Sequence, residues 1–257
     1  MKFDMKLINI KLLVSLFAVG LLSTACVSQK QEEKENENVQ ARARAHTELG
    51  AAYYQQNQLE IALEEFNKAI RMDPNFATAY NGLGLINASL GKDDVAEANF
   101  KKAVQLAPND SESHNNYGSF LCARNRVDEA IGEFLAAVKN PLYATPAMAY
   151  TNAAVCSVRK NDVVTAEKYL QLALQTDPLS KPAAYQLASL QFKRNDAVAA
   201  KKTLQNVLLL RPGPEVLWLA IQIEREVGDK DAESSYALQL RRQFPDSQQA
   251  TLLESGK

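Results

Sequence analysis

Cysteine and histidine side chains are the groups in this 257-residue sequence best suited to covalent or metal chemistry. Cys26 follows an apolar segment near the N-terminus, whereas Cys122 and Cys156 lie in the middle of the chain. Two thiols form a disulfide when their Cα atoms approach to about 4.4–6.8 Å, and buried thiols otherwise behave as small apolar groups. Position alone leaves both interpretations open for Cys122 and Cys156. Three cysteines are too few for a disulfide scaffold, and two histidines are too few for a multi-histidine metal site.

The remaining polar residues do not form a pattern typical of an enzyme. Ser, His and Asp make no recognisable nucleophile set, and no glycine-rich phosphate loop follows a predicted strand. His46 and His114 occupy the fourth position of a sequence repeat, and Tyr80 and Trp218 hold that position in other copies, which indicates packing. We therefore expect no enzymatic activity, cofactor, metal or small-molecule substrate. The net charge of -1 gives no general attraction to nucleic acid.

The elements that position these residues come from a repeated pattern of small, aromatic and proline residues. Its members are Leu49-Gly50, Ala62, Phe66, Ala69 and Pro74, then Leu83-Gly84, Ala96, Phe100, Ala103 and Pro108, then Tyr117-Gly118, Ala130, Phe134 and Ala137. A period of about 34 residues with these offsets is the mark of the tetratricopeptide repeat, a helix–turn–helix unit. The expected repeats begin at residues 43, 77, 111, 147, 181 and 215, the last being a degenerate cap. The sequence thus predicts an all-α, right-handed superhelix of about six repeats.

The residue types in each repeat explain why the pattern folds this way. Gly50, Ala62 and Ala69 allow two antiparallel helices to approach closely, and Phe66 fills the space around those contacts. Pro74 ends the second helix because it lacks an N–H group. Each unit leaves an apolar face that only its neighbour can cover, so the units must stack.

One link between repeats departs from the pattern. The segment 139–146 is longer than the other links and carries Pro141 and Pro146. It is either a tolerated loop insertion or a place where the pitch of the array changes or a partner makes contact.

Residues 1–25 are predicted to be the signal peptide of a lipoprotein. Lysines near the start precede an apolar stretch over residues 12–22, which is short for a membrane-spanning helix. The run Ser23-Thr24-Ala25-Cys26 resembles the lipobox of bacterial lipoproteins, and an ordinary signal peptide that happens to end near a cysteine is the alternative. The resemblance implies cleavage before Cys26 and acylation of that residue. Val27 is not Asp, which implies an outer-membrane anchor facing the periplasm.

Residues 26–42 are polar, highly charged and nearly free of apolar groups. Such a segment cannot bury enough surface to offset the entropy lost on ordering. We therefore expect a flexible tether between the lipid and the repeat domain, which spans residues 43–257.

The concave face of the array is where we expect a partner to bind. Five positions of each repeat are expected to face it, and the predicted partner-binding groove consists of Tyr54, Asn81, Leu85, Asn115, Ser119, Val155, Tyr185 and Phe192. An apolar stripe interrupted by amides suits an extended or helical peptide. The alternatives are that some of these side chains pack between helices, and that Asn81 and Asn115 are ordinary polar residues of a helix surface.

Repeat three and the segments after it resemble a narrower family. Asn115-Asn116-Tyr117-Gly118, the link residues Leu142-Tyr143 and Thr145-Pro146, and the tail Ser235-Tyr236-Ala237-Leu238-Gln239-Leu240 are similar to the PilF/PilW type IV pilus biogenesis and stability lipoproteins. The resemblance implies a pilotin, an outer-membrane lipoprotein that binds the type IV pilus secretin and promotes its localisation, multimerisation or stability. A lipid-anchored scaffold for another envelope or secretion complex is the alternative.

The same resemblance bears on the two central cysteines. Cys122 and Cys156 fall late in the first helices of repeats three and four, and similarity to the cysteine-bearing branch of the family implies a disulfide between them. Such a bond would hold repeat three against repeat four across the long link, and an oxidising periplasm would permit it.

Overall fold

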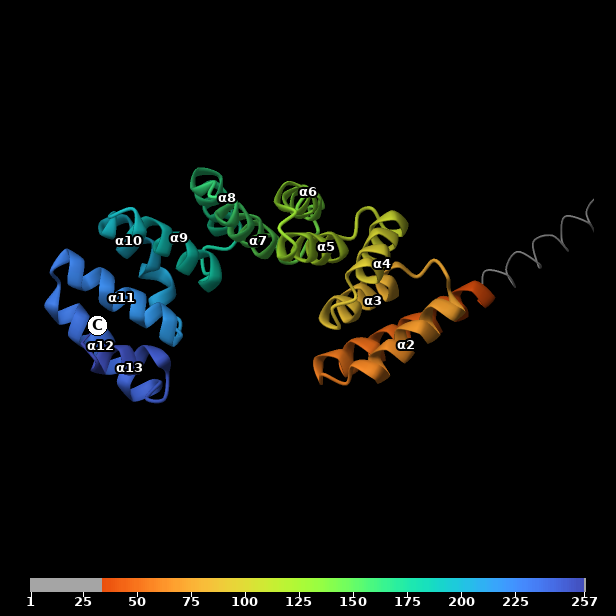
Figure 1. The fold of residues 1–257 in the computed structure, drawn as a ribbon, viewed down its shortest axis with the longest axis horizontal. Helices are drawn as coiled ribbons and strands as arrows, with labels where there is room; N and C mark the ends of the chain where they lie inside the picture. The colour runs from red at the N-terminus through yellow and green to blue at the C-terminus, as the bar shows by residue number, and fades with distance from the viewer. Residues whose placement is uncertain (1–33, 257) are drawn as a thin grey trace, which may run out of the picture. The chain divides into compact units, whose positions relative to one another are not determined.

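The computed structural model describes residues 34–256, and its regular structure over that range is entirely helical (Figure 1). The helices span residues 34–55, then α2 Leu59–Met72, α3 Ala77–Ser89, α4 Asp93–Leu106, α5 Ser111–Ala123, α6 Val127–Ala137, α7 Pro146–Arg159, α8 Val163–Thr176, α9 Lys181–Lys193, α10 Ala197–Leu208, α11 Pro214–Val227, α12 Lys230–Gln243 and α13 Gln248–Glu254. The prediction of an all-α tetratricopeptide fold is confirmed.

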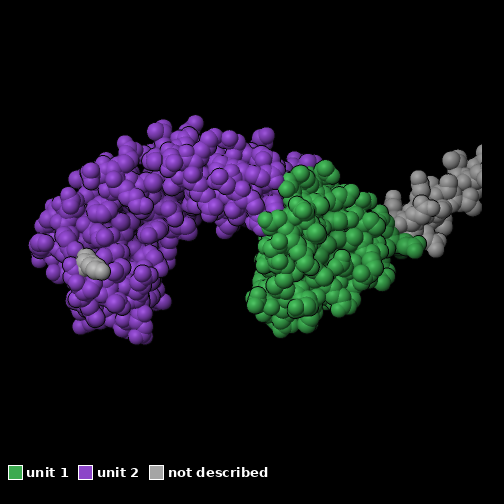
Figure 2. Space-filling model, viewed as in Figure 1, with its two compact units in different colours: residues 1–106 green, residues 107–257 purple. Residues whose placement is uncertain are grey.

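The chain divides into two compact units, which Figure 2 distinguishes by colour. Unit 1 ends at Leu106 and contains the helix over residues 34–55 together with α2, α3 and α4. Unit 2 begins at Ala107 and contains α5 to α13, in which each helix from α5 to α12 packs against the next along the chain. α3, α5, α7, α9 and α11 begin within one residue of the expected repeat starts at 77, 111, 147, 181 and 215, whereas the helix of the first repeat already runs from residue 34, before the expected start at 43.

Glycine and phenylalanine pack against each other inside the early repeats. A Cβ on Gly84 would lie 2.7 Å from the Phe100 ring, and one on Gly118 would lie 2.8 Å from the Phe134 ring. Both rings are buried, so the helices of a pair can approach only where the first one lacks a side chain.

In later repeats, a different pair of residues occupies the two positions where the helices of a pair approach closely. Ala154 and Leu170 are buried at these positions in repeat four, and Ala188 and Leu204 are buried in repeat five. The leucine side chain is smaller than the phenylalanine ring, so the residue that faces it can carry a methyl group. The volumes of the two facing residues therefore compensate along the array.

Left-handed backbone marks the turns within the repeats. Asn57, Asn125, Asn161 and Asn195 have φ between 59° and 62°, and Gly91 occupies the equivalent turn with φ 69°. Asparagine and glycine are the residues that adopt this conformation most readily at helix C-termini. These residues allow the chain to reverse between two antiparallel helices.

The predicted tether differs from the structure over its described part. Residues 34–42 are helical and continue without interruption into the first repeat, although most of their side chains are exposed. Glu, Lys, Gln, Ala and Arg dominate this stretch and are good helix formers, so a helix nucleated by the repeat extends into it without burial. Burial among the described residues begins at Ala43. The predicted signal peptide, the lipidation site Cys26 and the start of the tether lie outside the described residues.

Helix α13 is an element that the repeat pattern did not predict. Ala250 is buried in a cluster with Leu217, Ile221 and Leu240 of α11 and α12, and Leu253 packs against that cluster. α13 therefore covers an apolar face that α11 and α12 of repeat six present.

Candidate partner-binding surface and interhelical cross-links

The predicted groove residues of unit 1 form a small half-buried face. Tyr54 and Leu85 are both half-buried, and the Tyr54 hydroxyl lies 3.2 Å from Ser89 Oγ. Ser89 Oγ in turn donates to the Leu85 carbonyl at 3.0 Å. These contacts place an aromatic ring, an aliphatic side chain and a hydroxyl together across repeats one and two. This is a surface that can bind an apolar side chain and one polar group of a peptide.

The two asparagines of the predicted groove are not available in the way we expected. Asn81 and Asn115 are 7% and 4% exposed. Asn115 Oδ1 accepts a hydrogen bond from Asn152 Nδ2 at 3.0 Å, which ties α5 to α7. These amides are buried, so the structure does not expose them to a partner as the predicted groove requires. The periodicity placed them on the inner face, but it did not show that a neighbouring helix covers that part of the face.

The groove residues of unit 2 are divided between surface and packing. Ser119 is exposed and Val155 is half-buried. Tyr185 and Phe192 pack against the buried cluster that joins α9, α10 and α11. Part of the expected apolar stripe therefore stabilises the contact between repeats five and six, which is the alternative that the sequence had left open.

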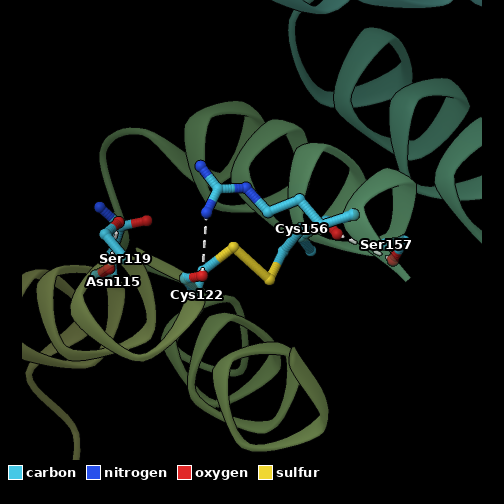
Figure 3. The surroundings of a disulfide bond; sticks show 7 residues. Asn115, Ser119, Cys122, Cys156 and Ser157 are labelled. Carbon is cyan, nitrogen blue, oxygen red and sulfur yellow. Dashed lines mark hydrogen bonds between the residues drawn. A yellow bond between two sulfur atoms is a disulfide. The ribbon is translucent and has the colours of Figure 1, made fainter. Parts of the chain in front are cut away.

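Cys122 and Cys156 form a disulfide that joins α5 to α7 (Figure 3). Their Cα atoms are 5.8 Å apart, within the usual range for a disulfide. Cys122 is 7% exposed and Cys156 is fully buried. The Arg159 guanidinium donates to the Cys122 carbonyl at 3.1 Å beside the bond. The first helices of repeats three and four are thus joined by a covalent bond and by hydrogen bonds at two levels.

Both histidines pair with a glutamate at the same repeat position. His46 Nδ1 lies 2.6 Å from Glu65 Oε2, and His114 Nδ1 lies 2.6 Å from Glu133 Oε2. The hydrogen bond to Glu133 raises the pKa of His114, and the Pro108 carbonyl, 3.0 Å from Nε2, adds to this effect. In the other pair, the hydrogen bond with His46 lowers the pKa of the Glu65 carboxyl group. Each pair joins the two helices of one repeat.

The equivalent residues of repeat four confirm that these positions serve helix packing. Tyr150 and Tyr169 stack there with ring centroids 6.5 Å apart. Within residues 34–256 no group of three or more His, Cys, Asp or Glu side chains is arranged to hold a metal ion. In the same range no helix is both long and apolar enough to cross a bilayer.

A pocket of about 370 Å³ lies near the C-terminal end of unit 2. Leu204, Leu208, Ile223 and Tyr236 line it, together with Lys201. The Lys201 ammonium is already paired, with Glu224 at 2.6 Å and Asp229 at 3.0 Å. These contacts, rather than a ligand, satisfy the charges at the pocket wall.

Comparison with known proteins gives this arrangement a family. Profiles described as TPR repeat or tetratricopeptide repeat match residues 50–91, 77–110, 99–132 and 158–221. The chain is 29% identical over 238 residues to the type IV pilus assembly protein PilF of Pseudomonas aeruginosa, and the match covers 91% of this chain and 94% of that protein. The chain is a PilF/PilW-like tetratricopeptide repeat protein.

Solved structures support the same assignment. PilW, described as a widely conserved type IV pilus biogenesis factor, is 28% identical with a TM-score of 0.69, covering 82% of this chain and 97% of that one. The structure of P. aeruginosa PilF is 25% identical with a TM-score of 0.73, covering 86% of this chain and all of that one. The resemblance inferred from the residues around repeat three is thereby confirmed.

Proposed function

We propose that this protein is an outer-membrane-anchored scaffold of type IV pilus biogenesis. It binds the pilus secretin and promotes its outer-membrane localisation, multimerisation or stability. The observation that carries this proposal is the similarity to the pilus assembly protein PilF across 91% of the chain, because it extends over the whole repeat array and beyond the general repeat pattern.

Each part of the chain has a role in the proposed mechanism. Acyl chains on Cys26 hold the protein at the outer membrane, and the segment that follows carries the repeats away from the lipid. The surface around Tyr54 and Leu85 holds a segment of a secretin subunit. Confining subunits to one membrane raises their local concentration, which favours multimerisation without any catalytic step.

Deletion of the gene is the experiment that tests this proposal. Secretin multimers are measured on non-boiled gels of separated inner and outer membranes, and twitching motility is measured alongside. We expect the multimers to be lost or to accumulate in the wrong membrane. A normal multimer in the outer membrane with motility intact would contradict the proposal. That result would leave a scaffold for another envelope complex, whose partner crosslinking would identify.

A further inference from the structure

In three of the links between repeats, the residue after a proline is asparagine in one link and leucine in two, and the fold does not require this difference. Asn75 follows Pro74 in the first link, whereas Leu142 follows Pro141 and Leu179 follows Pro178 in later ones. The three residues make the same local turn. The backbone N–H of Asn75 donates to Asp73 Oδ1 at 2.9 Å, that of Leu142 to Asn140 Oδ1 at 3.0 Å, and that of Leu179 to Asp177 Oδ1 at 3.0 Å. The residue after the proline contributes only its backbone N–H to this turn, so an asparagine satisfies the turn as well as a leucine.

The leucines of these links are exposed to solvent in the isolated chain. Leu142 is 88% exposed and Leu179 is 52% exposed, and Leu209 in the following link is 83% exposed. The neighbouring Tyr143 is buried in a cluster with Ala137 and Ala149, which fixes the base of the long link while Leu142 points outward. Leu142 and Leu209 bury little of their surface within the chain, so their apolar side chains are free to contact another surface.

The three links lie beside one another along one edge of unit 2. A pocket of about 660 Å³ is lined by residues of the links that contain Leu142 and Leu179. Lys181 Nζ donates to the Arg211 carbonyl at 3.2 Å, which joins the second link to the third. We call residues 139–146, 177–182 and 209–214 the loop rim. Each of its links contains at least one proline, so the rim is stiff and loses little freedom when it binds.

The charges of the loop rim favour an anionic surface as its partner. Lys139, Lys181 and Arg211 are its basic residues and Asp177 is its acidic residue, and the Glu215 carboxylate lies at its edge beside Gly213, so basic groups outnumber acidic ones there by three to two. Single leucines at the tips of separate loops, with basic residues beside them, differ from a concave apolar groove that encloses a peptide. The arrangement suits a fluid interface, in which each tip can enter separately while the basic groups meet phosphate.

We propose that the loop rim docks onto an anionic lipid bilayer, with Leu142, Leu179 and Leu209 entering the interfacial layer. Docking would hold unit 2 against the membrane to which the chain is anchored, and in this respect it rests on the proposed function. Its physical basis is independent of the anchor, because the leucines and the basic residues belong to the described part of unit 2.

Vesicle flotation tests the proposal without the acyl anchor. The chain is prepared from residue 27 onward, which keeps every described residue, and is mixed with vesicles of phosphatidylethanolamine and phosphatidylglycerol. We expect the protein to float with these vesicles and to float less with phosphatidylcholine alone. The variant Leu142→Asn/Leu179→Asn places asparagine at both positions, as the link after α2 already has at Asn75. We expect it to lower the partition coefficient at least about tenfold, because two apolar side chains no longer leave water.

Val164→Asn/Val198→Asn is the matched control. These two valines are 79% and 73% exposed near the starts of α8 and α10, at the opposite ends of the helical hairpins. The control should float like the unaltered chain, and circular dichroism should show equal helicity for all three proteins. The proposal is overturned if the unaltered chain stays in the soluble fraction, if the leucine variant floats equally well, or if the control is impaired to the same degree.

The outcome is separable from that of the secretin assay. If the chain binds vesicles but deletion of its gene leaves secretin multimers unchanged, the docking proposal stands and the proposed function is wrong. If the leucine variant disrupts secretin multimers while the unaltered chain binds no vesicles, the loop rim is a protein interface and the lipid proposal is wrong.

Discussion

At the scale of single residues, a glycine that packs against an aromatic ring leaves no room for a side chain. Phe134 is 1% exposed and packs directly on Gly118, so the space in which a side chain could fit is already filled. The same chain offers the alternative solution in repeats four and five, where alanine faces leucine. The residue types at these two positions depend on each other.

We predict that Gly118→Ala destabilises the protein by about 1–3 kcal/mol, because the added methyl group must displace the Phe134 ring or the backbone of α6. Urea denaturation followed by circular dichroism measures the change. Gly132→Ala is the matched control, since a Cβ there meets no atom within 4 Å. That control should be neutral or slightly stabilising because alanine is the better helix former.

The double variant Gly118→Ala/Phe134→Leu reproduces the pair used by later repeats. We predict that it is more stable than Gly118→Ala alone, because the smaller side chain restores the space that the methyl group takes. If the two single effects simply add in a double-mutant cycle, the proposed compensation of volumes is wrong.

His114 and Glu133 make the stability of repeat three depend on pH. The hydrogen bond to Glu133 raises the pKa of His114 above its ordinary value. The protonated ring is therefore favoured in the folded state, so its contribution is complete below the unfolded pKa of about 6.5 and is lost as pH rises through the folded pKa.

We predict that Glu133→Gln lowers the unfolding free energy more at pH 5.5 than at pH 8. Urea denaturation at the two pH values measures this difference, and NMR titration of the His114 ring measures the pKa itself. A loss that is equal at both pH values, or an NMR pKa at or below the ordinary value, would show that the pair has no such electrostatic role.

At the scale of elements, repeats three and four are joined differently from the others. The disulfide closes a sequence separation of 34 residues between α5 and α7, and the Asn115–Asn152 and Arg159–Cys122 hydrogen bonds lie along the same pair of helices. The long link over residues 139–146 lies between these repeats. The cross-links fix how repeat four is placed on repeat three despite the irregular link.

We predict that Cys122→Ser/Cys156→Ser lowers the unfolding free energy by about 2–4 kcal/mol, since the unfolded chain regains the freedom that the bond removes. Chemical denaturation of the oxidised protein and of the variant measures it. Alkylation without reductant of the protein isolated from cells, read by mass spectrometry, provides the control. Two modified thiols in the unaltered protein would show that the bond does not form in the cell.

The face formed by Tyr54 and Leu85 is the element-level test of partner binding. We predict that Tyr54→Ala/Leu85→Ala weakens binding of the secretin in calorimetry while helicity stays unchanged, because both side chains are only half-buried and contribute apolar contact area. Val164→Asn/Val198→Asn, at exposed positions in unit 2, is a control for nonspecific loss of apolar surface. Unchanged affinity of the Tyr54/Leu85 variant would place the binding surface elsewhere.

At the scale of the whole molecule, the proposed function depends on attachment to the membrane. We predict that Cys26→Ser lowers the amount of protein in the outer-membrane fraction, because acyl chains on Cys26 would supply most of its affinity for lipid. Membrane fractionation with immunodetection measures the distribution, and Cys122→Ser/Cys156→Ser, which retains Cys26, is the control for cysteine loss. A variant that stays in the outer membrane in full amount would contradict acylation at this residue.

The sequence alone determined the repeat fold, because the features that produce it are local. Small residues, phenylalanine, turn asparagines and prolines recur at fixed offsets, and each acts within its own helical hairpin or on the adjacent one. The resemblance around Asn115-Asn116-Tyr117-Gly118 also pointed to the PilF/PilW-like family from the sequence alone, and the comparisons confirmed it.

Only the tertiary structure decided which inner-face residues remain accessible and what caps the array. Periodicity assigned Asn81 and Asn115 to the inner face, but burial depends on how closely the neighbouring helix approaches, and that distance is not encoded in spacing. α13 lacks the repeat signature, so its packing on α11 and α12 had no periodic signal to reveal it. The helix over residues 34–42 likewise follows from continuity with the first repeat rather than from its own burial.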